Sequence, residues 1–337
     1  MKNLVATVFG MGLLASPALA QQLELNWPTP NQAWSEGKTI SAYLQDAGTS
    51  DPASGGFGGV RTSGKQFHEG MDLKALHRDR RGEATDPVFA AMDGVVRHVN
   101  GIAGNSSYGR YIVLEHPTLK PAVYTLYAHL AKIAPGINAG ASVRRGQTLG
   151  VMGRSAGGYS IPKQRAHLHF EIGVLLTRGF QRWYDWKDFG SQNGQGIYNG
   201  MNLMGVDPLD FFNRHRERRI ISVQDYFDQM RPAVKLRIAT KQIPDYVQRY
   251  PTLVAHHLPI LIAGWEIEMN WTGLPYRWVA LDATAVKGMQ PNEVKIIYVD
   301  SIAASREKSK RLVATRQGKQ VPDRDLETVL QLLFGRR

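Results

Sequence analysis

The chain has 337 residues, of which 43% are hydrophobic and 21% charged, and its formal net charge is +12. These values are typical of a globular protein with a buried core and exclude a largely disordered chain. Because the sequence contains no cysteine, disulfides and thiolate metal sites are excluded, and any zinc must be bound by histidine and carboxylate side chains.

The first twenty residues have the pattern of a secretory signal peptide. Lys2 precedes an apolar run from Leu4 to Ala15, and small residues stand at Ala18 and Ala20. The run is shorter than the roughly 20 residues that span a bilayer. We therefore expect cleavage after Ala20 rather than a membrane anchor. This predicts a periplasmic or secreted protein with no transmembrane segment in its mature chain.

Residues 21–59 are rich in Pro, Gly, Ser and Asn, which predicts loops and brief strands. Residues 59–65 then have the spacing of a phosphate-binding P-loop. However, Gln66 stands where that motif needs Ser or Thr to hold magnesium, and no buried strand precedes it. We therefore disfavour a nucleotide site.

His68 and Asp72 are the first candidate metal ligands. With Glu69 they resemble the helical zincin motif His-Glu-x-x-His, but Gly70 disfavours a helix at this point. A simple surface pair of the two residues is the other alternative.

Residues 87–173 alternate short apolar segments with turn residues. Such strands, rich in β-branched and aromatic residues, are typical of an antiparallel sandwich or open barrel. His129 is expected at the end of one of them. The predicted strands are 88–91, 94–96, 110–114, 123–127, 149–152 and a strand through residue 167.

The segment Arg165–Glu171 reads Arg-Ala-His-Leu-His-Phe-Glu. Side chains alternate along a strand, so His167 and His169 must project from one face while Leu168 and Phe170 point to the other. One imidazole could then bind a metal while its neighbour transfers a proton. A structural pair on a half-exposed strand is the alternative interpretation.

Taken in order, these motifs resemble the LytM/lysostaphin family of zinc peptidases, which cut peptide bonds in bacterial peptidoglycan. The resemblance covers residues 27–212 and implies a mainly β catalytic domain. It implies a zinc-activated water that hydrolyses the peptide cross-links between peptidoglycan stems. It also implies a role for each residue: His68, Asp72 and His169 would bind Zn²⁺, His167 would accept a proton, and His129 would orient the water or stabilise the oxyanion.

The composition changes after Phe212, where a run rich in arginine begins. We predict a signal peptide at 1–20, a zinc peptidase domain at 21–212 and a smaller, basic α+β domain of no recognised family at 213–337. The elements expected in the last part are a helix at 222–230, strands at 265–271, 276–281 and 294–299, and a helix capped by Asp323 that ends before Gly335.

The strand expected at 265–271 would carry four large apolar side chains on one face, Trp265, Ile267, Met269 and Trp271. The simplest interpretation is that this face packs into the core. The alternative, functional interpretation is a glycan-binding platform. Most of the positive charge lies after residue 212, which suits docking to anionic envelope polymers. No nucleic-acid partner is expected, because no nucleic-acid-binding module is recognised. Targeting, autoinhibition and partner binding all stay open for this domain.

Other histidines compete for the site. We expect His116 to be structural, His77 and His98 to be solvated, and the pair at 256–257 to lie in packing or at the surface. The main alternative function is a catalytically inactive relative that activates cell-wall amidases. Such relatives typically lose ligands, whereas all five residues are present here, so we favour the enzyme. A polyanion binder is a third possibility that rests on charge alone.

Overall fold

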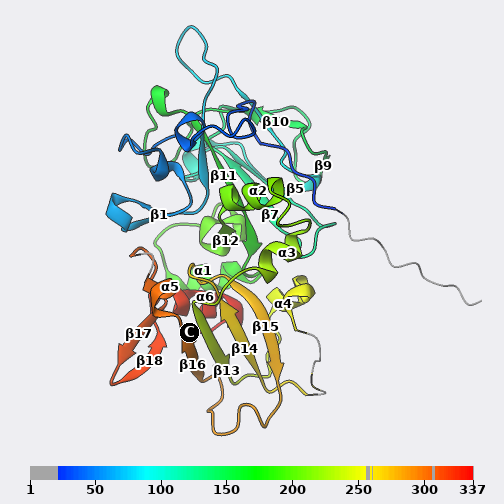
Figure 1. The fold of residues 1–337 in the computed structure, drawn as a ribbon, viewed down its shortest axis with the longest axis vertical. Helices are drawn as coiled ribbons and strands as arrows, with labels where there is room; N and C mark the ends of the chain where they lie inside the picture. Colours follow the sequence, from blue (N-terminus) through cyan, green and yellow to red (C-terminus); the bar gives the residue numbers. More distant parts are fainter. Residues whose placement is uncertain (1–21, 256–258, 260, 306–307, 337) are drawn as a thin grey trace, which may run out of the picture.

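The computed structural model describes residues 22–255, 259, 261–305 and 308–336. Two parts lie one above the other along its long axis (Figure 1). The expected signal peptide and the histidine pair at 256–257 fall outside the described residues. No helix in the described part of the chain is both long enough and apolar enough to cross a membrane.

The upper part is built around a seven-stranded antiparallel sheet. Its order is β12-β11-β7-β6-β5-β9, and β3 also pairs with β11. A three-stranded sheet, β4-β10-β8, and a hairpin of β1 and β2 accompany it. The strands are β1 (Gly58–Arg61), β2 (Gln66–His68), β3 (Met71–Lys74), β4 (Pro87–Phe89), β5 (Gly94–Asn100), β6 (Tyr111–Glu115), β7 (Tyr124–Ala128), β8 (Lys132–Ile133), β9 (Ser142–Val143), β10 (Thr148–Val151), β11 (His167–Leu175) and β12 (Leu203–Val206).

The predicted mainly β fold is therefore confirmed, and the structure moves some boundaries. β5 extends to Asn100, four residues beyond the expected end, and β7 ends at Ala128, immediately before His129. The segment before β1 lacks the brief strands that we expected among its loops. Up to residue 57 it contains the short 3-10 helices η1 (Ile40–Ala42) and η2 (Pro52–Gly55), and the apolar stretch 23–25 is not a strand.

β11 lies in the interior of the sheet and organises the site. β7 pairs along one edge, while β3 and β12 share the other edge, β3 beside residues 167–170 and β12 beside residues 172–175. Leu168 and Phe170 are fully buried, as the alternation predicts, and the Phe170 ring packs against Tyr127. The core thus fixes the strand whose other face carries the two histidines.

The helices α2 (Pro208–Arg216) and α3 (Val223–Asp228) connect the last strand of the upper part to the lower part. The helix α1 (Phe180–Lys187) lies between β11 and β12, and α4 (Asp245–Arg249) belongs to the lower part. The predicted helix at 222–230 is confirmed as α3, which begins with a capping box between Ser222 and Asp225. The domain boundary expected after Phe212 falls inside α2. We refer to residues 217–336 as the C-terminal module.

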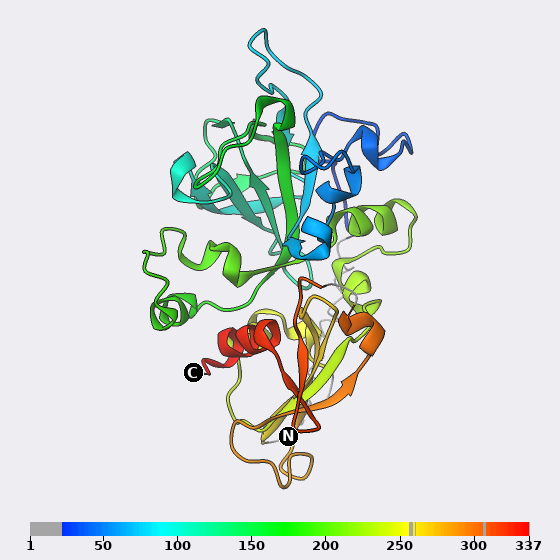
Figure 2. The same cartoon turned by 90° about the vertical axis from the view of Figure 1, so that its left-hand side faces the viewer.

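The C-terminal module is an α+β unit, as expected. Its main antiparallel sheet has the order β15-β14-β13-β16, and β17 and β18 form a separate hairpin. Figure 2 shows α6 beside these strands. The elements are β13 (Val234–Ile238), β14 (Gly264–Met269), β15 (Pro275–Leu281), β16 (Val294–Val299), α5 (Ser301–Ser305), β17 (Val313–Arg316), β18 (Lys319–Pro322) and α6 (Arg324–Phe334).

Trp265, Ile267 and Met269 are buried, which confirms the core interpretation of their face over the glycan platform. Two expectations for this module need correction. Trp271 lies beyond the end of β14. Asp323 precedes α6, but its carboxylate binds the guanidinium of Arg311 at 2.8 and 3.0 Å instead of capping the helix.

Aromatic and polar contacts join the two parts close to the candidate site. The Trp271 ring lies 5.7 Å from the Phe57 ring and 6.0 Å from the Phe67 ring, which precedes His68. On another side, the backbone amide of Leu175 at the end of β11 donates to the Tyr250 hydroxyl. The C-terminal module therefore packs against the strands that carry the site.

Candidate metal centre

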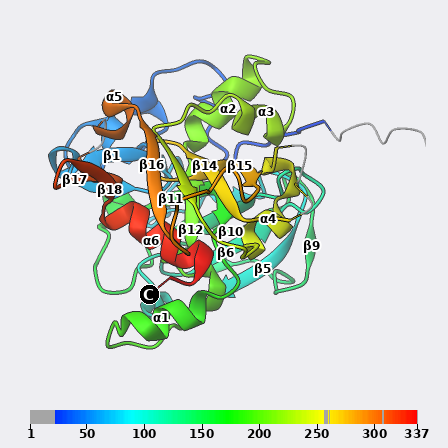
Figure 3. The same ribbon diagram turned by 90° about the horizontal axis from the view of Figure 1, so that it is seen from below.

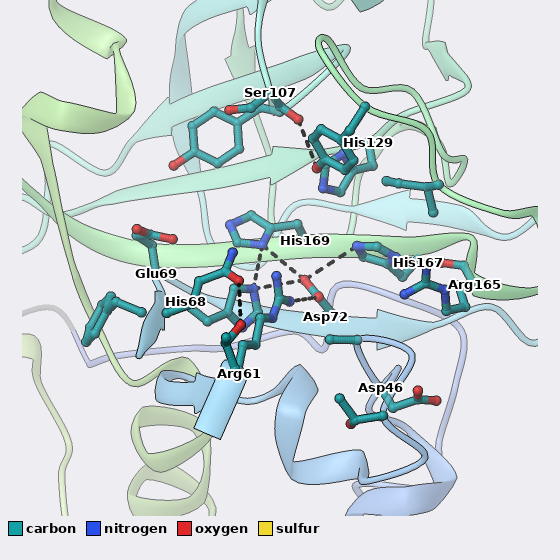
Figure 4. A pocket seen from close by; sticks show the side chains of 18 of the residues that line it. Asp46, Arg61, His68, Glu69, Asp72, Ser107, His129, Arg165, His167 and His169 are labelled. Atoms are coloured by element: carbon teal, nitrogen blue, oxygen red, sulfur yellow. Dashed lines mark hydrogen bonds and ion pairs between the residues drawn. The ribbon is translucent and has the colours of Figure 1, made fainter. Parts of the chain in front are cut away.

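Three predicted ligands meet at one point although they lie far apart in the sequence. His68 ends β2, Asp72 lies in β3 and His169 lies in β11. Their candidate ligand atoms all lie within 4.8 Å of one another, and the three residues are buried. Asp72 Oδ1 is 3.1 Å from His68 Nε2 and 3.0 Å from His169 Nδ1, and those two nitrogens are 3.0 Å apart (Figure 4).

A tight turn makes the approach of His68 to Asp72 possible. A Cβ atom on Gly70 would lie only 2.3 Å from the Phe170 carbonyl oxygen, so a side chain there would displace β11. Residues 66–74 form two short strands rather than a helix, which excludes the zincin interpretation of this motif. Pairing of β3 with β11 places Asp72 directly opposite His169.

Hydrogen bonds on the outer side of each imidazole determine which nitrogen faces the cluster. Nδ1 of His68 lies 2.6 Å from the Gly56 carbonyl oxygen, and Nε2 of His169 lies 3.0 Å from Glu171 Oε1. A carbonyl oxygen and a carboxylate both accept hydrogen bonds, so His68 Nδ1 and His169 Nε2 carry the hydrogens. The inner nitrogens and Asp72 Oδ1 are then all acceptors facing one another. Such a cluster requires a cation, either a proton or a metal ion.

The remaining two predicted residues border the same cluster. Nδ1 of His167 donates to the Arg165 carbonyl oxygen at 2.6 Å, and Nδ1 of His129 donates to the Ser155 carbonyl oxygen at 2.8 Å. Their Nε2 atoms are therefore the free acceptors. Nε2 of His167 lies 3.5 Å from Asp72 Oδ1, and the two imidazole rings are 4.9 Å apart. The structure thus brings all five predicted residues together.

His129 has a positive φ of 61°, in the left-handed region that non-glycine residues rarely adopt. It follows β7 immediately, and its backbone amide donates to the Tyr108 carbonyl oxygen at 2.9 Å. Strained backbone at the end of a strand is a common device for aiming a functional side chain. Here it turns the imidazole toward His167.

The charges of the cluster favour bound cations. Burial raises the pKa of Asp72, but the charges of His167 and His68 and hydrogen bonds from the histidines outweigh it, so the pKa lies well below its usual value. Burial lowers the pKa of His169, yet hydrogen bonds to Asp72 and Glu171 raise it to about 9. A proton and a metal ion therefore compete for Nδ1 of His169.

The pKa values of His167 and His129 are lowered, whereas that of His169 is raised. Burial lowers the pKa of His167, against the attraction of Asp72. Burial and the neighbouring histidines His167 and His169 together hold the pKa of His129 well below its usual value. Both imidazoles are therefore neutral at neutral pH, and a neutral imidazole can accept a proton.

Four further residues at the site were not predicted. Glu171 is buried at 1% exposure and accepts hydrogen bonds from the hydroxyls of Tyr108 at 2.6 Å and Tyr124 at 2.8 Å while it holds His169. Arg61, from β1, binds the other oxygen of Asp72 and also donates to the Ser54 carbonyl oxygen. Glu171 could have been found from the alternation of β11, because it shares a face with His167 and His169. The Arg61 and tyrosine contacts depend on tertiary folding.

A cleft of about 480 Å³ opens beside the cluster. It is lined by the five predicted residues and by groups that include Arg61, Tyr108 and Tyr159. The ligand cluster is thus accessible from one side, as a substrate site requires.

The other described histidines lie outside the cluster. His116 is fully buried, donates from Nδ1 to the Asp93 carbonyl oxygen and places Nε2 2.8 Å from Thr125 Oγ1. His77 has 62% of its side chain exposed beside Asp86. His98, expected to be solvated, is instead half-buried and lies 2.9 Å from Gln195 Oε1.

The fold and the site together define a mainly β domain with a candidate centre for one metal ion. Residues 66–179 match the model of peptidase family M23. This segment contains all three candidate ligands and both neighbouring histidines. This match confirms the predicted resemblance to the LytM and lysostaphin type of peptidase.

The chain is also similar to solved structures. These include a zinc-containing peptidase from Vibrio cholerae, with 25% identity over 45% of this chain and 37% of that one and a TM-score of 0.29. A putative glycyl-glycine endopeptidase LytM from Ruminococcus gnavus has 30% identity over 34% and 42% of the two chains and a TM-score of 0.27. The catalytic domain of lysostaphin from Staphylococcus simulans has 20% identity over 52% and 95% and a TM-score of 0.31.

The chain thus spans less than half the length of the first two structures. Comparison with curated proteins gives no match.

Proposed function

We propose that the protein is an exported zinc metalloendopeptidase that hydrolyses peptide cross-links in bacterial peptidoglycan. The observation that carries this proposal is the convergence of His68 Nε2, His169 Nδ1 and Asp72 Oδ1, three acceptors that need a shared cation. Two neutral histidines stand beside them at an open cleft. The match of residues 66–179 to the model of peptidase family M23 supports both the metal and the substrate class.

The donor set fits zinc. Two imidazole nitrogens and one carboxylate oxygen, with a fourth side left to the cleft, are typical of catalytic rather than structural zinc sites. His68, Asp72 and His169 would hold the ion. When bound, zinc would polarise the scissile carbonyl and lower the pKa of a water molecule to near neutral.

The chain's own residues would then move the protons. His167 would accept a proton from the attacking water through its free Nε2 and pass it to the departing amine. His129 would orient the water from across the cleft by accepting a hydrogen bond from it at Nε2, whereas stabilisation of an oxyanion would first require protonation of that nitrogen. Since hydrogen bonds to backbone carbonyls fix the outer nitrogens, neither ring needs to change tautomer before it acts.

We also propose export with removal of residues 1–20, which would place the protein in the periplasm or outside the cell. A peptidase domain at 21–212 and a basic domain at 213–337 remain our proposed division of the chain. The basic domain would contact anionic envelope polymers. Determination of the N-terminal residue of the secreted protein would test the predicted cleavage after Ala20.

Incubation with purified sacculi tests the activity. Zinc-loaded protein should release soluble fragments, which mass spectrometry would identify as products of cross-link hydrolysis. Treatment with a chelator should stop the release, and added zinc should restore it. His77→Ala provides a matched control, because this imidazole is exposed and outside the site.

An inactive regulator would behave differently. Stimulation of a cell-wall amidase, with no fragments released by the zinc-loaded protein alone, would contradict the peptidase proposal and favour the alternative.

A further inference from the structure

A second cavity lies next to the cleft beside the candidate ligands, on the side of the C-terminal module. Its volume is about 880 Å³. Three residues line both spaces: Glu69, which directly follows His68, and Ser107 and Tyr108. Figure 4 shows Glu69 and Ser107 beside the histidine cluster. The second cavity is therefore adjacent to the space in which a substrate would meet the ligand cluster.

Both parts of the molecule form the walls of this second cavity. The upper part contributes the segment around α1, including Trp183 and Lys187, and the C-terminal module contributes α6 and Lys310. Figure 3 shows α1 next to α6. The indole nitrogen of Trp183 donates to Gln331 Oε1 at 3.2 Å, which ties the two helices together. The cavity depends on the C-terminal module for one of its sides.

Lys310 is one of the charged residues that line the second cavity. Its Nζ lies 4.0 Å from the centre of the Phe67 ring, one residue before His68. Within the described ranges, no carboxylate forms an ion pair with this ammonium group and no hydrogen bond is made by it. Burial lowers the pKa of Lys310, while the more distant Glu69 and Asp325 raise it. The ammonium group is therefore only partly solvated, and its hydrogens are available for donation to a ligand.

Among the described residues, Glu69 and Asp325 attract the Lys310 ammonium group, but neither forms an ion pair with it. The carboxylate of Asp325 accepts from the Arg311 amide at 2.6 Å and from the Arg324 guanidinium at 3.2 Å. The Phe67 ring attracts the half-buried ammonium group but accepts no conventional hydrogen bond from it, so a ligand with acceptor oxygens would lower the cost of its burial. A carboxylate is the ligand that best matches a lone ammonium group.

We propose that Lys310 binds a carboxylate of the peptidoglycan stem peptide and that the second cavity holds the rest of that stem. The inference rests on the proposed function and assigns the C-terminal module to substrate recognition. Lys187 and Lys310 share the cavity with Glu69 and Asp325, so the lining has no net charge among these groups. This balance suits a peptide with isolated charges and disfavours a long polyanion, which needs a row of cations.

Substitution of Lys310 combined with a change in the substrate tests the contact. The substrate is a purified cross-linked muropeptide dimer, prepared with free stem carboxylates and with the same carboxylates amidated. Lys310→Gln should raise KM for the free form about tenfold, equivalent to about 1.4 kcal/mol, with little change in kcat. The same variant should leave KM for the amidated form unchanged, and Lys310→Arg should restore part of the affinity.

Lys319→Gln is the matched control, because Lys319 is exposed on β18 and does not line the cavity. Equal KM values for Lys310→Gln and Lys319→Gln on the free substrate would overturn the inference. Equal losses on free and amidated substrates would also overturn it, because they would indicate a general structural effect.

A binding experiment separates this inference from the peptidase proposal. Calorimetry would measure the affinity of an uncross-linked stem tetrapeptide, which contains no cross-link to hydrolyse, for the wild type and for Lys310→Gln. Affinity that depends on Lys310 without any hydrolysis of sacculi would support the inference and contradict the peptidase proposal. Hydrolysis with tetrapeptide affinity unaffected by Lys310→Gln would do the reverse.

Discussion

β11 and β14 are both interior strands of antiparallel sheets, and both alternate polar with apolar side chains. Their apolar faces are alike, since each packs into a core. Their polar faces differ. His167, His169 and Glu171 of β11 are buried, whereas Glu266 and Glu268 of β14 are only partly covered. Alternation therefore predicts a strand but does not distinguish a site from a solvated surface.

The difference lies in what each polar face meets. On β14, Glu266 lies opposite Arg237 and Glu268 opposite Lys235, so each carboxylate has a cation at 2.8 Å. On β11, the polar face meets further acceptors from β2 and β3. The guanidinium of Arg61 binds Asp72 Oδ2 and leaves Oδ1 and the two inner imidazole nitrogens without a cation from the described residues. A charge-balanced face is stable by itself, and a face of acceptors requires a cation from outside.

The largest effect should follow from breaking the acceptor cluster itself. His169→Ala removes one ligand nitrogen and should abolish both zinc binding and hydrolysis, because two remaining ligands hold the ion too weakly. Metal analysis after dialysis, together with fragment release from sacculi, measures both. Full zinc occupancy in this variant would contradict the assignment.

His167→Ala should separate metal binding from turnover. His167 lies beside the cluster and is not one of the three ligands, so zinc should be retained while kcat falls by about 10² to 10⁴, as expected for loss of a general base. Steady-state kinetics on a cross-linked muropeptide checks this. An unchanged kcat would show that a group other than His167 accepts the proton.

His116 tests whether a buried histidine outside the cluster behaves as a structural group. Burial lowers its pKa to about 4, whereas an unfolded histidine has a pKa near 6.5. Below pH 6.5 the unfolded chain therefore binds more protons, and stability falls as pH drops from 6.5 toward 4. The total loss is about 3 kcal/mol, with no loss above pH 6.5.

Urea unfolding at a series of pH values would measure this dependence. In His116→Gln the part of the slope between pH 6.5 and 4 that is due to His116 should disappear. An identical pH dependence in the wild type and the variant would show that this imidazole does not remain neutral in the fold.

Glu171→Gln should weaken zinc binding about 10 to 100-fold. Glutamine keeps the shape but removes the negative charge that supports His169, and it cannot serve His169, Tyr108 and Tyr124 equally well. Competition with a chromophoric chelator would give the affinity. Glu268→Gln on β14 is the matched control and should leave zinc binding unaltered.

The smallest effect should come from the polar face of β14. Glu266→Gln removes one partner of a partly exposed ion pair, and the free energy of unfolding should change by less than about 1 kcal/mol. Thermal or urea unfolding would detect a larger change. A loss of several kcal/mol would mean that the stability of the protein depends strongly on the ion pairs of this face.

The sequence was sufficient for the local features of the molecule. The strand through His167 and the helix after Ser222 could be predicted, because alternation and capping residues are local signals. The convergence of the five candidate site residues followed from the family resemblance, and their individual roles stay predictions. Long-range features could not be predicted. The approach of Arg61 to Asp72 and the packing of Trp271 on Phe57 depend on how distant segments pair.

Some errors have the same origin. His98 was expected to be solvated, but the segment that carries Gln195 folds over it. Asp323 was expected to cap α6, but the guanidinium of Arg311 takes its carboxylate. In both cases a tertiary partner competed with the local preference and prevailed.

The central claim is that His68, Asp72 and His169 hold one metal ion. X-ray absorption spectroscopy of the zinc-loaded protein, with its metal content measured on the same sample, tests this directly. We predict one zinc per chain, bound by two imidazole nitrogens and one carboxylate from the protein. A protein that takes up no zinc, or a spectrum that requires a different set of protein ligands such as three or four imidazoles, would contradict the account.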